Sequence, residues 1–352
     1  MELTTVRPDG LESFVAAIFT ATGMSADDAT LMARILVTAD LRGVHTHGVS
    51  FTPTYVARLL DPNGINPRGR PSVMSDRGAA LLVDAGNAMG HLAAHFSMRH
   101  AIDRARLTGI AAVAVRGSNH CGAMAFYPML ALPEDMIGIA MTGALPSMAA
   151  WGGLDQILGN NPIAAAIPAL EERPIVIDVA FQATFPLKIR LWQQRGWPIP
   201  EDWSFDAEGR PTTDPERALE GWGQPVGKYK GVALALLTGA LSVLLSGAAW
   251  GRELGTMADG PVAGRDGHFF LAVDIAAFSD PQIFKRRVDG VIREIHSSRR
   301  TAEVKRILLP GERAAESEQR GRAGGVALSR VTLEQLFETA ARVGVATPAE
   351  LS

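Results

Sequence analysis

One uncharged stretch limits the folds open to this chain more than any other feature. From Gly231 to Gly251 the sequence contains no Asp, Glu, Lys or Arg, and a run of that length can cross a lipid bilayer as a helix. It also contains four glycines, two serines and a threonine, and lysines before it and Arg252 after it leave no charge asymmetry to orient it. We therefore predict a helix buried within protein, with a membrane span as the alternative.

The composition otherwise predicts a well-buried globular protein. Of the 352 residues, 47% are hydrophobic and 20% charged, which suits two or three domains that share a sizeable core. The net charge of -3 gives no electrostatic footprint for nucleic acid or an anionic membrane surface. Cys121 is the single cysteine, which excludes an internal disulfide framework and a cysteine-based zinc site. Because residues 1–10 contain no apolar signal core, we expect a cytoplasmic protein.

A short segment around residue 45 contains the ingredients of a proton-transfer site. Residues 39–49 read Ala-Asp-Leu-Arg-Gly-Val-His-Thr-His-Gly-Val, which places His45, Thr46 and His47 between two glycines. Histidine titrates near neutral pH, and a hydroxyl beside it can hold or pass a proton. Histidines in a loop can equally be solvated or structurally hydrogen-bonded, so this segment alone leaves both interpretations open.

Hydrophobic periodicity predicts a chain of mixed helices and strands. Ser25 and Asp28 have the spacing of a capping box at the start of one helix, and Thr332 and Gln335 have it at the start of another. Residues 312–325 are polar, and we predict that they are exposed. The predicted helices cover residues 11–22, 25–40, 88–108 and 281–296, and the predicted strands cover 79–84, 110–116, 136–142, 175–178 and 268–274.

The helix predicted over residues 88–108 carries His91, His95 and His100. His91 and His95 have the i, i+4 spacing of half a zinc motif. However, Leu92 stands where a metalloprotease needs a glutamate base. We therefore predict packing or surface histidines and no metal site.

Two turns and one strand end can bring polar groups to a ligand. Residues 116–123 read Arg-Gly-Ser-Asn-His-Cys-Gly-Ala after a predicted strand, where backbone amides can approach a phosphate; an ordinary turn is the alternative. Residues 159–162, Gly-Asn-Asn-Pro, are a strong turn signal. Asp178 ends a short predicted strand, a place from which a carboxylate can orient an imidazole.

Three common motifs are absent. No G-x-G-x-x-G follows a predicted strand, so a standard Rossmann dinucleotide site is not supported. Gly227-Lys228 lacks the upstream glycine of a P-loop, and no G-x-S-x-G nucleophile elbow occurs.

Five segments, in this order and at these spacings, resemble the malate/L-lactate dehydrogenase family, which also contains ureidoglycolate and sulfolactate dehydrogenases and the piperideine-2-carboxylate and pyrroline-2-carboxylate reductases. The resemblance implies NADP- or NAD-dependent reduction of a 2-oxo acid or a cyclic imino acid, with NADPH favoured. It also implies an α/β (α+β-like), non-Rossmann fold with a mostly antiparallel central sheet and helices from both chain ends, in a homodimer with active sites near the subunit interface. The segments are residues 39–49, 119–127, 159–162, 229–247 and 309–312.

Residue by residue, the resemblance assigns roles in a site. His47 matches the family's proton donor, Thr46 the hydroxyl before it, and Asp178 the aspartate that holds the imidazole and favours its protonated form. Tyr55 and His120 match positions that face the substrate. The positions that match cofactor contacts are His120, Gly122, Ala123, Asn160, Asn161, Lys230, Pro310, Gly311, Glu312 and Arg313.

Two departures from the family pattern make the predicted pocket more apolar. Phe51 stands four residues after His47, where the family usually has an arginine suited to the substrate carboxylate. Residues 181–186, usually small and hydroxylated, contain two phenylalanines and a proline. We therefore predict that Phe51 faces a ketone or imine substrate that is larger and more apolar than malate or lactate. A family member that binds ligand or serves a structural role without turnover is the alternative.

The expected domains follow the same resemblance. Residues 1–75 form a helical part that carries the histidine loop and packs with residues 281–352. Residues 76–117 and 224–280 form a central α/β part, and residues 118–223 bind the nicotinamide cofactor. Candidates for a 2'-phosphate site are Arg299, Arg300 and Arg313.

Overall fold

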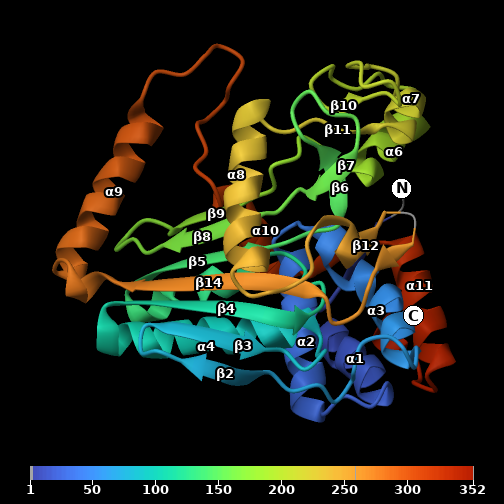
Figure 1. Ribbon diagram of the computed structural model, residues 1–352, viewed down its shortest axis with the longest axis horizontal. Helices are drawn as coiled ribbons and strands as arrows, with labels where there is room; N and C mark the ends of the chain where they lie inside the picture. The colour runs from blue at the N-terminus through green and yellow to red at the C-terminus, as the bar shows by residue number, and fades with distance from the viewer. Residues whose placement is uncertain (1–2, 258, 352) are drawn as a thin grey trace.

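The computed structural model describes residues 3–257 and 259–351, and a seven-stranded sheet forms its centre (Figure 1). The strand order is β2-β3-β4-β14-β5-β8-β9, and β3 and β4 form the one parallel pair within this sheet. The mostly antiparallel, non-Rossmann fold is therefore confirmed. The strands are β2 (Ser72–Asp76), β3 (Ala80–Asp84), β4 (Ile110–Ser118), β5 (Met136–Thr142), β8 (Ile163–Ile167), β9 (Ile175–Val179) and β14 (Asp266–Asp274).

Both ends of the chain meet in one helical layer beside the sheet (Figure 1). Strand β1 (Leu3–Val6) pairs antiparallel with β15 (Val326–Ser329), which ties the two ends together. Buried apolar side chains from both ends, such as Phe19 and Leu336, share one core. The helices of this layer are α1 (Pro8–Ala21), α2 (Ala26–Leu41), α3 (Thr52–Leu60) and α11 (Arg330–Arg342).

The caps of these helices show how local sequence sets their starts. The Ser25 hydroxyl accepts the Asp28 amide proton at 3.3 Å and donates to the Asp28 carboxylate at 2.6 Å, which confirms the predicted start of α2. The predicted start of the last helix is wrong by a few residues. Ser329 is the residue that caps α11, because its hydroxyl accepts the Thr332 amide proton at 3.1 Å.

Helix α4 (Gly90–Thr108) packs against β4 and β14 through a face rich in alanine, which allows a close approach. Its first residue has no room for a side chain, because a Cβ on Gly90 would lie 1.8 Å from the Asn119 carbonyl oxygen. The start of α4 therefore presses directly on the segment that contains His120. The prediction of packing or surface histidines on this helix holds for His91, which is fully buried.

The uncharged stretch forms α8 (Tyr229–Gly239), which continues as a π-helix over Ala240–Leu244. Within residues 3–257 and 259–351, no helix is long and apolar enough to cross a membrane. The prediction of a buried helix is correct for one face only. The opposite face is open to solvent in the single chain, with exposed fractions of 49% at Leu234, 56% at Leu237 and 62% at Leu245.

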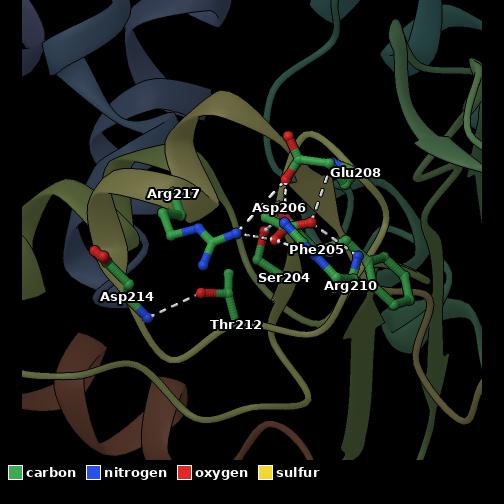
Figure 2. Close-up of polar contacts among 8 residues, drawn as sticks. All are labelled: Ser204, Phe205, Asp206, Glu208, Arg210, Thr212, Asp214 and Arg217. Carbon is green, nitrogen blue, oxygen red and sulfur yellow. Dashed lines mark hydrogen bonds and ion pairs between the residues drawn. The ribbon is translucent and has the colours of Figure 1, made fainter.

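Residues 186–226 form an excursion with its own aromatic cluster around Trp192 and Trp203 (Figure 1). Figure 2 shows how the Asp206 carboxylate organises its turn: it accepts the amide proton of Arg210 at 2.9 Å and the guanidinium protons of Arg217 at 2.5 Å. This network explains why the segment is ordered despite its many prolines and glycines. Its elements are α6 (Pro186–Gln194), β10 (Ser204–Phe205), α7 (Pro215–Glu220) and β11 (Trp222–Gly223), and β6 (Pro146–Ala149) and β7 (Gln156–Gly159) lie beside them.

The segment predicted only to be polar and exposed is in fact helix α10 (Glu312–Gly324). Its apolar periodicity is weak because it packs through Gly321, whose missing side chain leaves room for Leu41 of α2. Helix α9 (Pro281–Ser297) lies at the far end of the sheet, away from α1 and α11, so it does not pack with residues 1–75 as expected (Figure 1). The remaining elements are α5 (Phe126–Met129), β12 (Gly255–Thr256) and β13 (Gly260–Pro261).

Candidate active site

The connection between α2 and α3, residues 42–51, carries His47 and is called the His47 loop below. It contains two short 3-10 turns, His45–His47 and Val49–Phe51. The Thr46 hydroxyl oxygen lies 2.9 Å from His47 Nδ1, so a hydroxyl anchors one ring nitrogen. Burial lowers the pKa of His47. The predicted hydroxyl–imidazole pair is therefore present.

Aromatic rings surround His47. The ring centre of Phe51 lies 5.9 Å from that of His47 and 5.5 Å from that of His120, and the two imidazole centres are 5.8 Å apart. The planes of these three rings differ by only 20° to 30°. Phe51 therefore places an apolar ring beside both imidazoles, at the position where the family resemblance implies an arginine.

Tyr55 lies beneath this group and not on its surface. Its side chain is 1% exposed, and its hydroxyl lies 2.7 Å from His120 Nδ1. The structure thus joins Tyr55 to His120, and the contact of Tyr55 with a substrate stays a prediction. Burial, aided by the nearby His47 and Arg58, lowers the pKa of His120 to about 3. His120 is therefore neutral near pH 7.

The turn after His120 depends on Gly122. This glycine has φ +73°, and a Cβ there would lie 2.5 Å from His91 Nε2. Among the described residues, neither ring nitrogen of the buried His91 has a hydrogen-bond partner. Burial lowers the pKa of His91 well below its ordinary value, so this imidazole packs as a neutral ring under the turn.

A second buried imidazole, His268 on β14, ties the sheet to the same turn. Its Nδ1 lies 2.7 Å from the Thr142 hydroxyl and its Nε2 2.8 Å from the Ser118 hydroxyl. Burial lowers the pKa of His268 to about 4. His268 therefore joins β14 to β5 and β4 directly below the segment that carries His120.

Arg58 and Asp266 are two further ionisable groups close enough to Tyr55 to influence its hydroxyl. Arg58 donates to the Asn119 side-chain oxygen at 3.2 Å. Asp266 is 5% exposed, and burial raises the pKa of its carboxyl to about 7, although Arg58 opposes this shift. The groups behind the site are therefore polar, and the imidazoles among them, His91, His120 and His268, are neutral near pH 7.

Asp178 lies beside the turn after His120 and does not contact His47. Its carboxylate accepts the Ala125 amide proton at 2.8 Å. In the part of the chain that the structure describes, no hydrogen bond or ion pair joins Asp178 to His47. Asp178 touches solvent in the single chain, but protein groups surround most of its carboxylate. This partial loss of hydration raises the pKa of its carboxyl to about 6. The Ala125 and Met124 amides and Arg42 act in the opposite direction. Its role toward the imidazole stays a prediction.

Two of the segments predicted to bind cofactor meet along β9, the edge strand. The Pro310 carbonyl accepts the Val176 amide proton at 3.1 Å, and Gly311, with φ +92°, packs so closely that a Cβ would lie 2.8 Å from the Val176 side chain. Asp178 follows on the same strand, beside the turn that contains Gly122 and Ala123. A cleft of about 430 Å³ opens beside Leu308 and is lined by charged side chains of both signs: Arg173, Arg300, Lys305 and Arg306 together with Glu172, Glu312 and Glu316.

The other residues predicted to bind cofactor either make hydrogen bonds within the protein or are exposed to solvent. The Asn161 side chain links the Ala144 amide, at 3.0 Å, to the Ala235 carbonyl of α8, at 2.9 Å. Asn160 is half-buried and its carbonyl accepts the Phe181 amide proton. The Glu312 carboxylate accepts the Leu309 amide proton at 3.0 Å and contacts His296 at 3.0 Å, whereas Lys230 and Arg313 are exposed.

Three polar residues of the site, Asp40, His268 and Arg58, were not predicted from the sequence. The Asp40 carboxylate lies 2.9 Å from His45 Nδ1. Asp40 carried a signal, because it occupies the last turn of a helix, where the helix dipole disfavours a carboxylate. His268 carried a weaker one as a polar residue in an apolar strand. Arg58 carried none, since an arginine on an amphipathic helix is ordinarily solvated.

The site thus combines two neighbouring imidazoles, His47 and His120, with a mostly antiparallel sheet that lacks the Rossmann strand order. Residues 6–337 match the family model described as malate/L-lactate dehydrogenase. The chain is 35% identical over 348 residues to the malate dehydrogenase of Pyrococcus horikoshii, covering 97% of this chain and 96% of that protein. The chain belongs to the malate/L-lactate dehydrogenase family and is one of its dehydrogenases, a family whose members include NAD- and NADP-dependent enzymes.

Solved structures agree. The sulfolactate dehydrogenase from Methanocaldococcus jannaschii superposes with a TM-score of 0.91 at 31% identity, covering 97% of this chain and 98% of that one. The delta1-piperideine-2-carboxylate reductase from Pseudomonas syringae pvar. tomato superposes with a TM-score of 0.82 at 26% identity, covering 96% and 100%.

Proposed function

We propose that this dehydrogenase transfers hydride between a nicotinamide cofactor and a ketone or imine carbon of a substrate bulkier or more apolar than malate or lactate. The family membership supports the reaction type. The observation that supports the substrate class is Phe51, whose ring lies 5.9 Å from that of His47 and 5.5 Å from that of His120. A 2-hydroxy or 2-oxo acid with an apolar chain and a cyclic imino acid both fit such a wall.

His47 serves as the proton donor in the direction of reduction. Nicotinamide, when bound, supplies the hydride. The His47 imidazolium gives its proton to the oxygen or nitrogen of the reduced group, while the Thr46 hydroxyl keeps hold of Nδ1. Because burial lowers the pKa of His47, its imidazolium is a stronger acid than an ordinary histidine, and its neutral ring is ready to accept a proton in the reverse direction. His120 stays neutral and contributes a hydrogen bond.

The sheet edge at β9 suits a dinucleotide. Gly122 and Ala123 match the family's cofactor contacts and follow His120 in a turn that Asp178 of β9 joins through the Ala125 amide, and Pro310 and Gly311 pack on the same strand. Four cationic side chains of the cleft beside Leu308 suit phosphate groups, and two of them, Arg173 and Arg306, pair with Glu316 in the single chain. Arg300 lines this cleft and supports NADP over NAD, whereas Arg299 and Arg313 are not among its lining residues.

The active form is proposed to be a homodimer in the cytoplasm. Leu234, Leu236 and Leu237 of α8 are exposed in the described part of the chain and form an apolar face on this helix. A second copy of this chain is the partner the family resemblance implies. Sedimentation equilibrium is expected to give twice the mass of the chain, and a monomer at micromolar concentration would contradict this.

Replacing Phe51 by arginine is expected to raise kcat/KM for malate and other small carboxylates by about 10- to 100-fold. The guanidinium would supply a charged hydrogen bond to the carboxylate, an interaction worth about 1.5 to 3 kcal/mol. Steady-state kinetics at 340 nm measure the change. Phe51→Leu is the matched control, since it alters the ring without adding charge, and equal gains in both variants would refute a carboxylate anchor at this position.

A further inference from the structure

Asp40 is a buried acid that the proposed chemistry does not use. It lies in the last turn of α2 and is 3% exposed. Its carboxylate contacts both ends of the segment that carries His47: Oδ1 lies 2.9 Å from His45 Nδ1, and Oδ2 accepts the Val49 amide proton at 2.7 Å. One side chain thus bridges the residues two positions before and two positions after His47.

The backbone of the loop is folded closely over this carboxylate. A Cβ on Gly48 would lie 2.2 Å from Asp40 Oδ2 and 2.4 Å from Oδ1. A glycine is therefore required at residue 48 for close approach, although its φ of −93° is open to any residue. The carboxylate fills the space that a side chain would take, so the loop and the acid fit together as one unit.

The charges around Asp40 single out His45 as its partner. Arg42, on the same helix, is held by Glu318 of α10 at 2.9 Å. His47 is engaged with Thr46. The His45 side chain is 54% exposed, yet its Nδ1 points back at the buried carboxylate. A buried carboxylate at the negative end of a helix dipole is costly unless it is hydrogen-bonded, and His45 and Val49 are the groups that satisfy it.

We infer that Asp40 is a positioning residue that latches the His47 loop closed through His45 and Val49. The latch fixes the direction in which His47 faces the substrate, so its consequence for turnover rests on the proposed function of His47. The closing of the loop by Asp40 does not depend on that proposed function. The hydrogen bond with Asp40 raises the pKa of His45, and burial raises the pKa of Asp40, so each group keeps its proton to a higher pH than it would in isolation.

Asp40→Asn tests the latch without changing its size. The carboxylate offers two acceptors to two donors, whereas an amide offers one acceptor and one donor. With neutral His45, the amide can donate to Nδ1 and accept from Val49, so the loop stays closed. With protonated His45, two donors compete for one acceptor, so the loop loosens. The opening of the variant relative to wild type should therefore grow as the pH falls.

Amide hydrogen exchange of Val49, followed by NMR in both proteins, measures this opening. The ratio of exchange rates, Asp40→Asn over wild type, is expected to stay within about threefold at pH 8 and to exceed about tenfold at pH 5.5, as loss of one buried hydrogen bond implies. The NMR titration of His45 should shift to a lower pKa in the variant. Asp40→Ala, which removes both contacts, should raise the ratio at both pH values.

A ratio near one at pH 5.5 together with an unchanged His45 titration would overturn the latch. Tryptophan fluorescence with added NADPH confirms that the variants keep the rest of the protein folded. The latch and the proposed function fail separately: a loosened loop establishes the latch whatever the turnover, whereas unchanged turnover on loss of the His47 imidazole refutes the proton donor alone.

Discussion

Replacing His47 by asparagine lowers the rate of substrate reduction by about 10²- to 10⁴-fold and leaves cofactor affinity unchanged. The reason is that the amide keeps a polar group near the position of Nδ1 but cannot carry the transferred proton, and general acid catalysis contributes about this factor. Single-turnover absorbance at 340 nm measures the rate, and fluorescence quenching by NADPH measures the affinity.

Thr46→Val is the matched control for this variant. It removes the hydroxyl that lies 2.9 Å from His47 Nδ1 but keeps the imidazole. Turnover should fall by a smaller factor, about 10-fold, as expected for the loss of one hydrogen bond. If His47→Asn reduced substrate at the wild-type rate while still binding NADPH, the proton donor would have to be another group, and the neutral His120 would be the first to examine.

Replacing His268 by glutamine removes a source of acid sensitivity worth about 3 kcal/mol. The pKa of His268 is lowered from 6.5 to about 4 because the imidazole is completely buried. The unfolded chain takes up a proton near pH 6.5 and the folded chain does not until about pH 4. Folding stability from this group is therefore fully present above pH 6.5 and is lost as the pH falls through that window.

Urea unfolding at pH 7.5 and pH 4.5 checks this expectation. The free energy of unfolding of wild type minus that of His268→Gln should be about 2.5 kcal/mol smaller at pH 4.5 than at pH 7.5. Asp266, whose pKa is raised to about 7, shifts stability in the opposite sense, but it titrates in both proteins and cancels in the difference. A difference that is the same at both pH values would show that His268 is accessible to protons in the folded chain.

The fold was largely predictable because its signals are local or belong to the family pattern. Ser25 and Asp28 form the cap that marks the start of α2. Gly109, with φ +80°, ends α4 at the predicted position. Helix α10 was not predicted because it packs through Gly321, where a side chain is absent. Its sequence therefore lacks the regular spacing of apolar residues that indicates a helix. The exposed face of α8 was missed because an uncharged sequence does not show which side lacks a partner.

The site was predictable at the level of residues but not of contacts. The sequence motif predicted roles for His47 and Thr46, which stay predictions, and the structure brings the two residues together with Phe51 and His120. Tyr55 was assigned to the substrate, yet its burial depends on how α3 meets the turn after β4, which no local pattern encodes. Asp40 shows the same limit, because its partners are set by the path of the loop.

The proposal that this chain catalyses nicotinamide-dependent hydride transfer on an apolar substrate beside Phe51 is tested by absorbance at 340 nm with NADPH and NADH. The substrate panel runs from pyruvate and oxaloacetate to 2-oxo acids with aromatic or branched chains and cyclic imino acids. Turnover is expected, with kcat/KM highest for the bulky apolar members. Higher kcat/KM for oxaloacetate or pyruvate than for any bulky substrate, or no turnover across the panel by a protein that binds NADPH, would contradict it.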